Sequence, residues 1–157
     1  MHFSEKDKTN KEAIGKPFPG FSFLTDRKTI DNNSLLGKTV FINFWFEACA
    51  PCIAEFDALN EMYQKFKDNK KFEFVSFTFE TPEKIKEIKT KYRLPYTIIS
   101  IEREECYRLN LNNGFPTSMV LDSTGAIKYM VHGGFTDKAK AREFVHAEIY
   151  PEIIKQL

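Results

Sequence analysis

The chain has 157 residues, of which 42% are hydrophobic and 29% are charged, as in an ordinary soluble globular protein. Its 23 lysines and arginines are balanced by 22 aspartates and glutamates, so no excess of positive charge favours a nucleic-acid partner. Three cysteines are too few for a scaffold held by disulfides, and no apolar run reaches the ~20 residues that span a bilayer.

The first part of the chain alternates polar stretches with short apolar runs. Residues 1–16 are mostly charged and polar, which predicts a flexible N-terminal lead-in to one domain at 17–157. Within that domain, short runs at 21–24 and 29–30 predict a β-hairpin. The next run, 39–46, is mostly apolar, which is typical of a buried strand.

Amphipathic helices and further strands fill the rest of the chain. Apolar side chains recur at three- and four-residue spacing from Pro51 to Lys67, which predicts a long helix with one buried face. The later predicted elements are a strand at 72–79, a helix at 82–92, a strand at 97–101, a short helical segment within 102–112, a hairpin of strands at 117–121 and 126–131, and a final helix from about Thr136, bent or broken before Pro151. This alternation, with no internal repeat, predicts an α/β fold class with a central mixed sheet flanked by helices on both faces.

Two cysteines lie where the strand at 39–46 ends and the long helix begins. The free N–H groups of a first helical turn carry positive potential, which stabilises a thiolate. Cys49 should therefore be more acidic than a free cysteine, and the thiolate is the reactive form of the side chain. The spacing of Cys49 and Cys52 indicates either redox chemistry or half of a zinc site, which needs about four ligands.

Further motifs accompany this pair in order along the chain. They are Gly37-Lys38, Asn43-Phe44-Trp45, Cys49-Ala50-Pro51-Cys52, Glu55, and Gly114-Phe115-Pro116-Thr117 leading into Met119-Val120-Leu121-Asp122 and Gly125. From about Pro17 to the last helix the sequence therefore resembles the thioredoxin superfamily, and within it the TlpA/ResA-like thiol–disulfide oxidoreductases. The resemblance implies a thioredoxin-like fold, here with the N-terminal β-hairpin as an extension, and an enzyme that works without a cofactor.

The resemblance also implies a role for each residue at the helix start. Cys49 would attack a protein disulfide, and Cys52 would resolve the mixed disulfide that forms. We expect Cys49 to be exposed at the end of the strand and Cys52 to be shielded. Glu55 would be a buried acid/base that exchanges a proton with the resolving thiol, because burial raises the pKa of a carboxyl group. The alternative for Glu55 is a solvent-facing position on the helix.

Three residues outside the helix complete the implied site. Pro116 resembles the superfamily's cis-proline, which would leave the backbone of Phe115 free to pair with a substrate chain. The Phe115 side chain either contacts substrate directly or belongs to the core. Asn43 stands where cytosolic thioredoxins carry a buried aspartate, and since an amide cannot titrate, the proton role passes to Glu55.

Two residues depart from the family pattern beside the first cysteine. Ala48 stands where a tryptophan is usual, which implies a more open substrate-binding surface beside Cys49. Glu47 would place a negative charge near the thiolate and oppose the effect of the helix end. The third cysteine, Cys106, is expected to be buried and structural, with a second redox role as the alternative.

Two metal functions are alternatives to redox chemistry. Zinc would have to recruit Cys106 or the histidines His2, His132 and His146, and no second pair has ligand spacing, so we predict no metal site. A copper-binding or metallochaperone domain of thioredoxin fold is the main alternative function, with His132 as its third ligand.

Partners and location follow from the family. We expect protein disulfide substrates, an upstream thiol electron donor and a monomeric chain. TlpA/ResA-like proteins usually work outside the cytoplasm, which implies a periplasmic or otherwise extracytoplasmic location. The charged lead-in fits the spacer left by a removed export segment or membrane tether, and it fits a cytosolic tail equally well.

Overall fold

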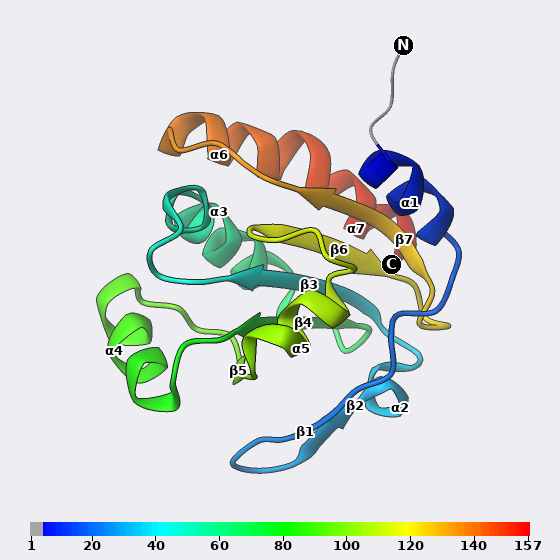
Figure 1. The fold of residues 1–157 in the computed structure, drawn as a ribbon, viewed down its shortest axis with the longest axis horizontal. Helices are drawn as coiled ribbons and strands as arrows, with labels where there is room; N and C mark the ends of the chain where they lie inside the picture. Colours follow the sequence, from blue (N-terminus) through cyan, green and yellow to red (C-terminus); the bar gives the residue numbers. More distant parts are fainter. Residues whose placement is uncertain (1–4) are drawn as a thin grey trace.

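A five-stranded mixed sheet forms the centre of the molecule (Figure 1). The structure, a computed structural model, describes residues 5–157, so residues 1–4 of the predicted lead-in, with His2, lie outside it. The sheet has the order β5-β4-β3-β6-β7, and its strands are β3 (Thr39–Trp45), β4 (Phe72–Thr78), β5 (Ile98–Ser100), β6 (Thr117–Leu121) and β7 (Ile127–His132). β3, β4 and β5 are parallel, whereas β6 runs antiparallel to both of its neighbours. The predicted mixed sheet is confirmed.

Helices cover both faces of this sheet, as predicted. They are α2 (Asn32–Leu35), α3 (Ala50–Phe66), α4 (Pro82–Tyr92), α5 (Arg103–Leu109), α6 (Lys138–Phe144) and α7 (Tyr150–Gln156). Side chains along β3 alternate between the two faces. Phe41 and Trp45 join the core that α3, α4 and α7 cover, and Ile42 and Phe44 join the core that α5 covers. Because both faces are buried, the strand reads as an almost continuous apolar run.

The predicted N-terminal hairpin is present as a small separate sheet (Figure 1). Its two antiparallel strands are β1 (Ser22–Leu24) and β2 (Thr29–Asp31). Aromatic rings attach it to the main sheet: Phe21 and Phe23 meet Phe77 of β4 edge-on, with ring centroids 5.7 and 6.0 Å apart. Such pairs add to the stabilisation that comes from burial alone.

The stretch that was predicted as a flexible lead-in is helical instead. Residues Glu5–Ala13 form α1, which lies beside β7 (Figure 1). The side-chain amides of Asn10 and Asn113 exchange hydrogen bonds of 2.6 and 3.0 Å, and the Gly15 N–H donates to the Ile127 carbonyl at 2.7 Å. The prediction was wrong because these contacts use amides and backbone groups, which a count of apolar side chains does not register.

The final helical segment is interrupted before Pro151, as predicted. α6 ends at Phe144, a π-helical turn follows over Val145–Ile149, and α7 begins at Tyr150. Pro151 thus lies in the first turn of α7, where its missing N–H group is not needed. α6 contacts α3, which brings the chain that follows β7 back to the helix that carries the cysteines.

Phe77 should contribute strongly to stability, because its ring is fully buried between the hairpin and the main sheet. Phe77→Ala is expected to lower the free energy of unfolding by about 3–5 kcal/mol. Leu24→Ala, at a hairpin side chain that is 83% exposed, should change it by less than about 0.5 kcal/mol. Urea unfolding of both variants measures the difference, and equal losses would show that the hairpin does not depend on this ring.

Candidate active site

The start of α3 is built on a cysteine instead of the usual polar cap. Cys49 is the N-cap residue, and its side chain makes no capping hydrogen bond to any described residue. Helices more often begin with Ser, Thr, Asp or Asn, whose oxygen atoms accept from the free N–H groups of the first turn. Here the positive helix end is left to act on the Cys49 sulfur. Pro51 is tolerated in this turn because its N–H group is not required.

Cys49 and Cys52 form a disulfide, with their Cα atoms 5.3 Å apart. Cys52 is shielded, with 2% exposure, as expected for a resolving thiol. Cys49 is also buried, with 6% exposure, so the prediction of an exposed Cys49 is wrong for this oxidised form. The sulfur of Cys49 is bonded to that of Cys52, and both residues belong to the core cluster that contains Trp45 and Phe56.

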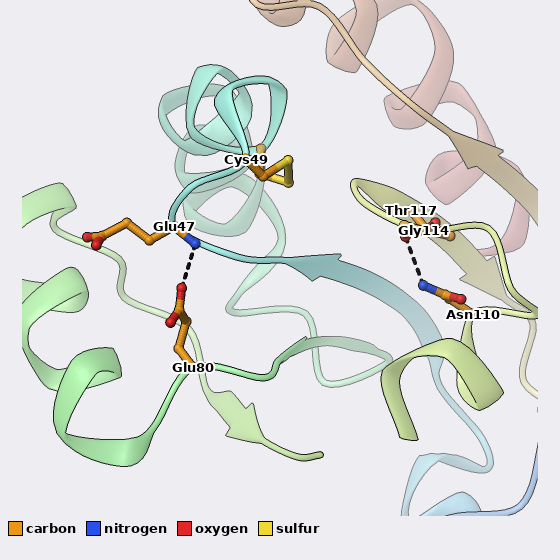
Figure 2. The surroundings of a disulfide bond; sticks show 7 residues. Glu47, Cys49, Glu80, Asn110, Gly114 and Thr117 are labelled. Atoms are coloured by element: carbon orange, nitrogen blue, oxygen red, sulfur yellow. Dashed lines mark hydrogen bonds between the residues drawn. A yellow bond between two sulfur atoms is a disulfide. The ribbon is translucent and has the colours of Figure 1, made fainter. Parts of the chain in front are cut away.

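An acidic residue that the sequence reasoning missed anchors the loop between β3 and α3. The Glu80 carboxylate, just beyond β4, accepts a hydrogen bond of 2.7 Å from the Glu47 N–H (Figure 2). Ser100, at the end of β5, donates to the Glu80 carbonyl at 2.6 Å. In the sequence, Glu80 could have been found only from its position just after a predicted strand. The carboxyl ends of parallel strands meet at one edge of a sheet, so a residue at this position should lie near the end of β3.

We predicted that the charge of Glu47 would oppose the effect of the helix end on the Cys49 sulfur, but the structure does not support this effect. The Glu47 carboxylate points away from the disulfide (Figure 2) and forms an ion pair with Lys84 at 3.1 Å. The negative charge is therefore balanced by a lysine of α4, and the effect of the helix end on Cys49 is not opposed by it.

Glu55 is one helical turn beyond Cys52 and is 2% exposed, so the solvent-facing alternative for this residue is excluded. Burial raises the pKa of its carboxyl group to about 8, because the charged form loses its hydration in the protein interior. A carboxyl group with this pKa can take up and release a proton near neutral pH.

The segment before β6 lies beside Glu55. The Phe115–Pro116 peptide bond is cis, and Pro116, Pro51 and Glu55 all border Gly134 in the loop that follows β7. Asn110, which is fully buried, holds the segment by donating from Nδ2 to the Gly114 carbonyl at 2.8 Å (Figure 2). Sequence reasoning did not identify Asn110, because nothing in its local pattern separates it from the neighbouring turn asparagines.

Phe115 is half-buried in a cluster of aromatic rings. Its ring meets those of Phe46, Phe79 and Tyr107 edge-on, with centroids 5.3, 5.4 and 5.5 Å apart. This environment favours the core alternative for the side chain of Phe115.

Ala48 is exposed and lines a cavity of about 480 Å³. The cavity is also lined by Phe56 of α3 and Tyr92 of α4, and by Thr136 and Lys138 on the side of α6. Ala48 and Ala50, which flank Cys49 in the chain, both line this cavity, and its use by a substrate stays a prediction.

Three other candidate residues are Asn43 of β3, Cys106 of α5 and His132 of β7. The Asn43 side chain is buried, and its Oδ1 has no hydrogen-bond partner within residues 5–157. Cys106 is buried in the core that α5 covers, and burial raises its pKa to about 12. His132 ends β7, with its Nε2 3.8 Å from Oδ1 of Asp7. Among the described residues, no three His, Cys, Asp or Glu side chains gather as a metal ion would require, and no helix is long and apolar enough to cross a membrane.

The sheet order, the flanking helices and the Cys-Ala-Pro-Cys disulfide at a helix start define a redox protein of thioredoxin-like fold. Residues 14–130 match the AhpC/TSA family. The thiol-disulfide oxidoreductase ResA of Bacillus thuringiensis (strain Al Hakam) is 31% identical over 134 residues, which are 83% of this chain and 75% of the relative. The ResA of Geobacillus kaustophilus is 30% identical over 128 residues, which are 79% of this chain and 72% of the relative.

Solved structures agree with this assignment. A thiol:disulfide interchange protein of the thioredoxin family from Chlorobium tepidum TLS has a TM-score of 0.66 at 26% identity and covers 85% of this chain and 96% of its own. A thiol-disulfide oxidoreductase from Bacteroides fragilis shares the fold, with a TM-score of 0.66 at 20% identity over 82% of this chain and 99% of its own. The chain belongs to the AhpC/TSA family within the thioredoxin superfamily. Together with its Cys49–Cys52 disulfide, this makes it a ResA-like thiol–disulfide oxidoreductase.

Glu55 should make the stability of the oxidised protein depend on pH. Its pKa is raised from 4.5 to about 8 on folding, so the folded state binds more protons than the unfolded state between these values. The stabilising contribution is complete below pH 4.5 and is lost as the pH rises to about 8. Between these limits the free energy of unfolding should fall by about 1.4 kcal/mol per pH unit from this group.

Urea unfolding at several pH values measures this slope. Glu55→Gln, which cannot titrate, should lack the part of the slope that Glu55 supplies. Identical slopes in the two proteins would contradict the raised pKa.

Proposed function

We propose that this enzyme reduces disulfide bonds of protein substrates through Cys49 and Cys52. The Cys49 thiolate attacks one sulfur of the substrate disulfide, which breaks as a mixed disulfide forms and the first substrate thiol leaves. Cys52 then attacks the Cys49 sulfur, which releases the second substrate thiol and closes the Cys49–Cys52 disulfide. Two electrons pass from the enzyme to the substrate, and an upstream thiol donor restores the dithiol. The disulfide at the uncapped start of α3 is the observation that carries this proposal.

Glu55 is proposed as the acid/base that serves Cys52. Both side chains are buried, so the Cys52 thiol has little access to water as a proton acceptor. With a pKa of about 8, the Glu55 carboxylate is able to take the Cys52 proton as this thiol attacks, and to return it when the disulfide is reduced. Asn43 cannot titrate, which leaves the proton to Glu55.

Ala48, Phe115 and Pro116 are proposed to form the substrate-binding surface. The backbone of Phe115 would pair with an extended substrate chain next to the disulfide under attack. The cavity at Ala48 would take a side chain that neighbours the substrate cysteine. Its lining combines the apolar Ile53, Phe56 and Tyr92 with the charged Glu47, Asp57 and Lys138, and the apolar part favours a large side chain with an apolar body.

We also propose that the enzyme works outside the cytoplasm, as a monomer whose thioredoxin-like domain spans 17–157, with α1 packed against it beside β7. The similarity to ResA proteins supports this location. A membrane tether through a removed N-terminal segment is part of the same proposal.

Reduction of insulin tests the proposed function. With dithiothreitol as the donor, the wild-type chain should accelerate precipitation of the insulin B chain, and Cys49→Ala should return the rate to the uncatalysed background because the nucleophile is gone. Cys106→Ala is the matched control, and it should keep the rate because Cys106 lies in the opposite core. A wild-type chain that is inactive and binds one Cu(I) tightly would instead support the copper-binding alternative.

Filling the cavity at Ala48 should change substrate preference. Ala48→Trp places an indole where Phe56 and Tyr92 line open space. It should lower kcat/KM about tenfold for a peptide disulfide flanked by phenylalanine, since a buried aromatic side chain contributes at least ~1.4 kcal/mol. A peptide flanked by glycine should react equally well with both enzymes. The same preference ratio in wild type and variant would contradict a substrate role for this cavity.

A further inference from the structure

Gly134, in the loop after β7, lies directly over the Glu55 carboxyl group. Gly134 itself is exposed, whereas Glu55 is 2% exposed. A Cβ atom on Gly134 would stand 2.8 Å from Glu55 Oε1, 3.3 Å from Pro116 Cγ and 3.6 Å from Pro51 Cβ. Real Cβ atoms essentially never come within 3.0 Å of another heavy atom outside their own chain neighbours. The absence of a side chain is what lets the loop close on this carboxyl group.

Backbone conformation does not account for this glycine. The φ angle of Gly134 lies outside the left-handed range, so this angle does not require glycine. The neighbouring Gly133 shows the opposite case, with φ at +78° and no atom within 4 Å of its Cβ position. Its N–H donates to the Pro116 carbonyl at 2.8 Å, which fixes the loop beside β6. Gly133 is therefore required by the backbone conformation of the turn, and Gly134 by the close approach of the loop to Glu55.

The surroundings decide what a methyl group at Gly134 would displace. Pro51 and Pro116 are rigid rings, one in the first turn of α3 and the other next to β6. The Glu55 carboxyl is the flexible end of its side chain, so either this group moves or the loop lifts. Either response breaks the close fit of the loop over the carboxyl group, and we expect water to reach this group as a result.

We infer that Gly134 is a positioning residue that excludes water from the Glu55 carboxyl group by closing the loop between β7 and α6 over it. Its effect on catalysis rests on the proposed function, because Glu55 is the proposed proton carrier. Its effect on the burial of Glu55 does not depend on that role.

Two other titratable side chains interact with Glu55. Tyr96, ahead of β5, is buried, and this burial, with a further contribution from Glu55, holds the pKa of its hydroxyl far above the usual range. Tyr129 of β7 has its pKa raised to about 12, first by burial and then by the carboxylates of Glu148, Glu152 and Glu55. Neither phenol titrates between about pH 5 and 10, so a titration at this site in that range belongs to Glu55.

The test follows the Glu55 carboxyl in the oxidised protein, where the joined Cys49 and Cys52 do not titrate. NMR of protein labelled with ¹³C at its glutamate carboxyl groups reports the titration, and the Glu55 signal is identified by its loss in Glu55→Gln. The wild-type midpoint is expected at about 8. Gly134→Ala should lower the midpoint by roughly one pH unit or more as water reaches the carboxyl group. Gly20→Ala, the matched control, adds the same methyl group at a glycine whose φ lies outside the left-handed range and whose Cβ position has no atom within 4 Å, and it should leave the midpoint unchanged.

An unchanged midpoint in Gly134→Ala would overturn the inference. If this variant is too unstable to titrate, the test is the thermal stability lost on Gly134→Ala, measured once in the wild-type protein and once in Glu55→Ala. Removing the contacted carboxyl should restore most of the stability that Gly134→Ala loses, and no restoration would overturn the inference equally.

The pH profile of insulin reduction separates this inference from the proposed function. A lowered Glu55 midpoint with a matching shift of the profile in Gly134→Ala supports both. A lowered midpoint with an unshifted profile supports the role of Gly134 and contradicts Glu55 as the proton carrier.

Discussion

A helix that begins with cysteine leaves the positive end of its backbone dipole facing sulfur, and the rest of the site depends on this junction of β3 and α3. A polar N-cap in place of Cys49 would be worth about 1 kcal/mol to the helix, so the protein gives up local stability at this point. It can do so because α3 is held by its buried face, which lies in the core with Phe41 and Trp45. Neighbouring strands then fix the loops around the junction: Glu80 follows β4, Asn110 precedes β6, and Gly134 follows β7.

The buried carboxyl group of Glu55 likewise lowers the stability of the fold while giving the site a group suited to proton transfer. Near neutral pH an ionisable group without water destabilises the fold, since the unfolded chain would release the proton more readily. The same burial brings the Glu55 pKa to about 8, which is where a proton carrier for a thiol is useful. Packing of aromatic rings in the same core offsets this loss of stability. The Phe74 ring stacks on Tyr96 with centroids 4.0 Å apart and meets Phe41 edge-on at 4.9 Å.

Much of the fold and the position of the cysteine pair were predictable, because they leave regular or local patterns in the sequence. The apolar run of β3 and the helical spacing of α3 placed Cys49 and Cys52 at the junction of these two elements, whereas the role of Glu55 was implied only by the resemblance to the family. Other features have no such pattern: Glu80 and Asn110 act through single hydrogen bonds to backbone atoms, and α1 is held by amides. Cys49 is buried in the disulfide form, and the close contact at Gly134 is with a carboxyl group 79 positions earlier in the chain. Such contacts are decided by tertiary structure, which periodicity does not encode.

The identity of the attacking cysteine is the most direct test of the central claim. In Cys52→Ser the resolving thiol is absent, so a mixed disulfide with insulin should persist. Peptide mapping by mass spectrometry identifies the cysteine that holds the substrate. The expected result is an adduct on Cys49 that dithiothreitol releases. An adduct on Cys106, or no adduct while Cys49 is reduced and open to alkylation, would contradict the proposed mechanism.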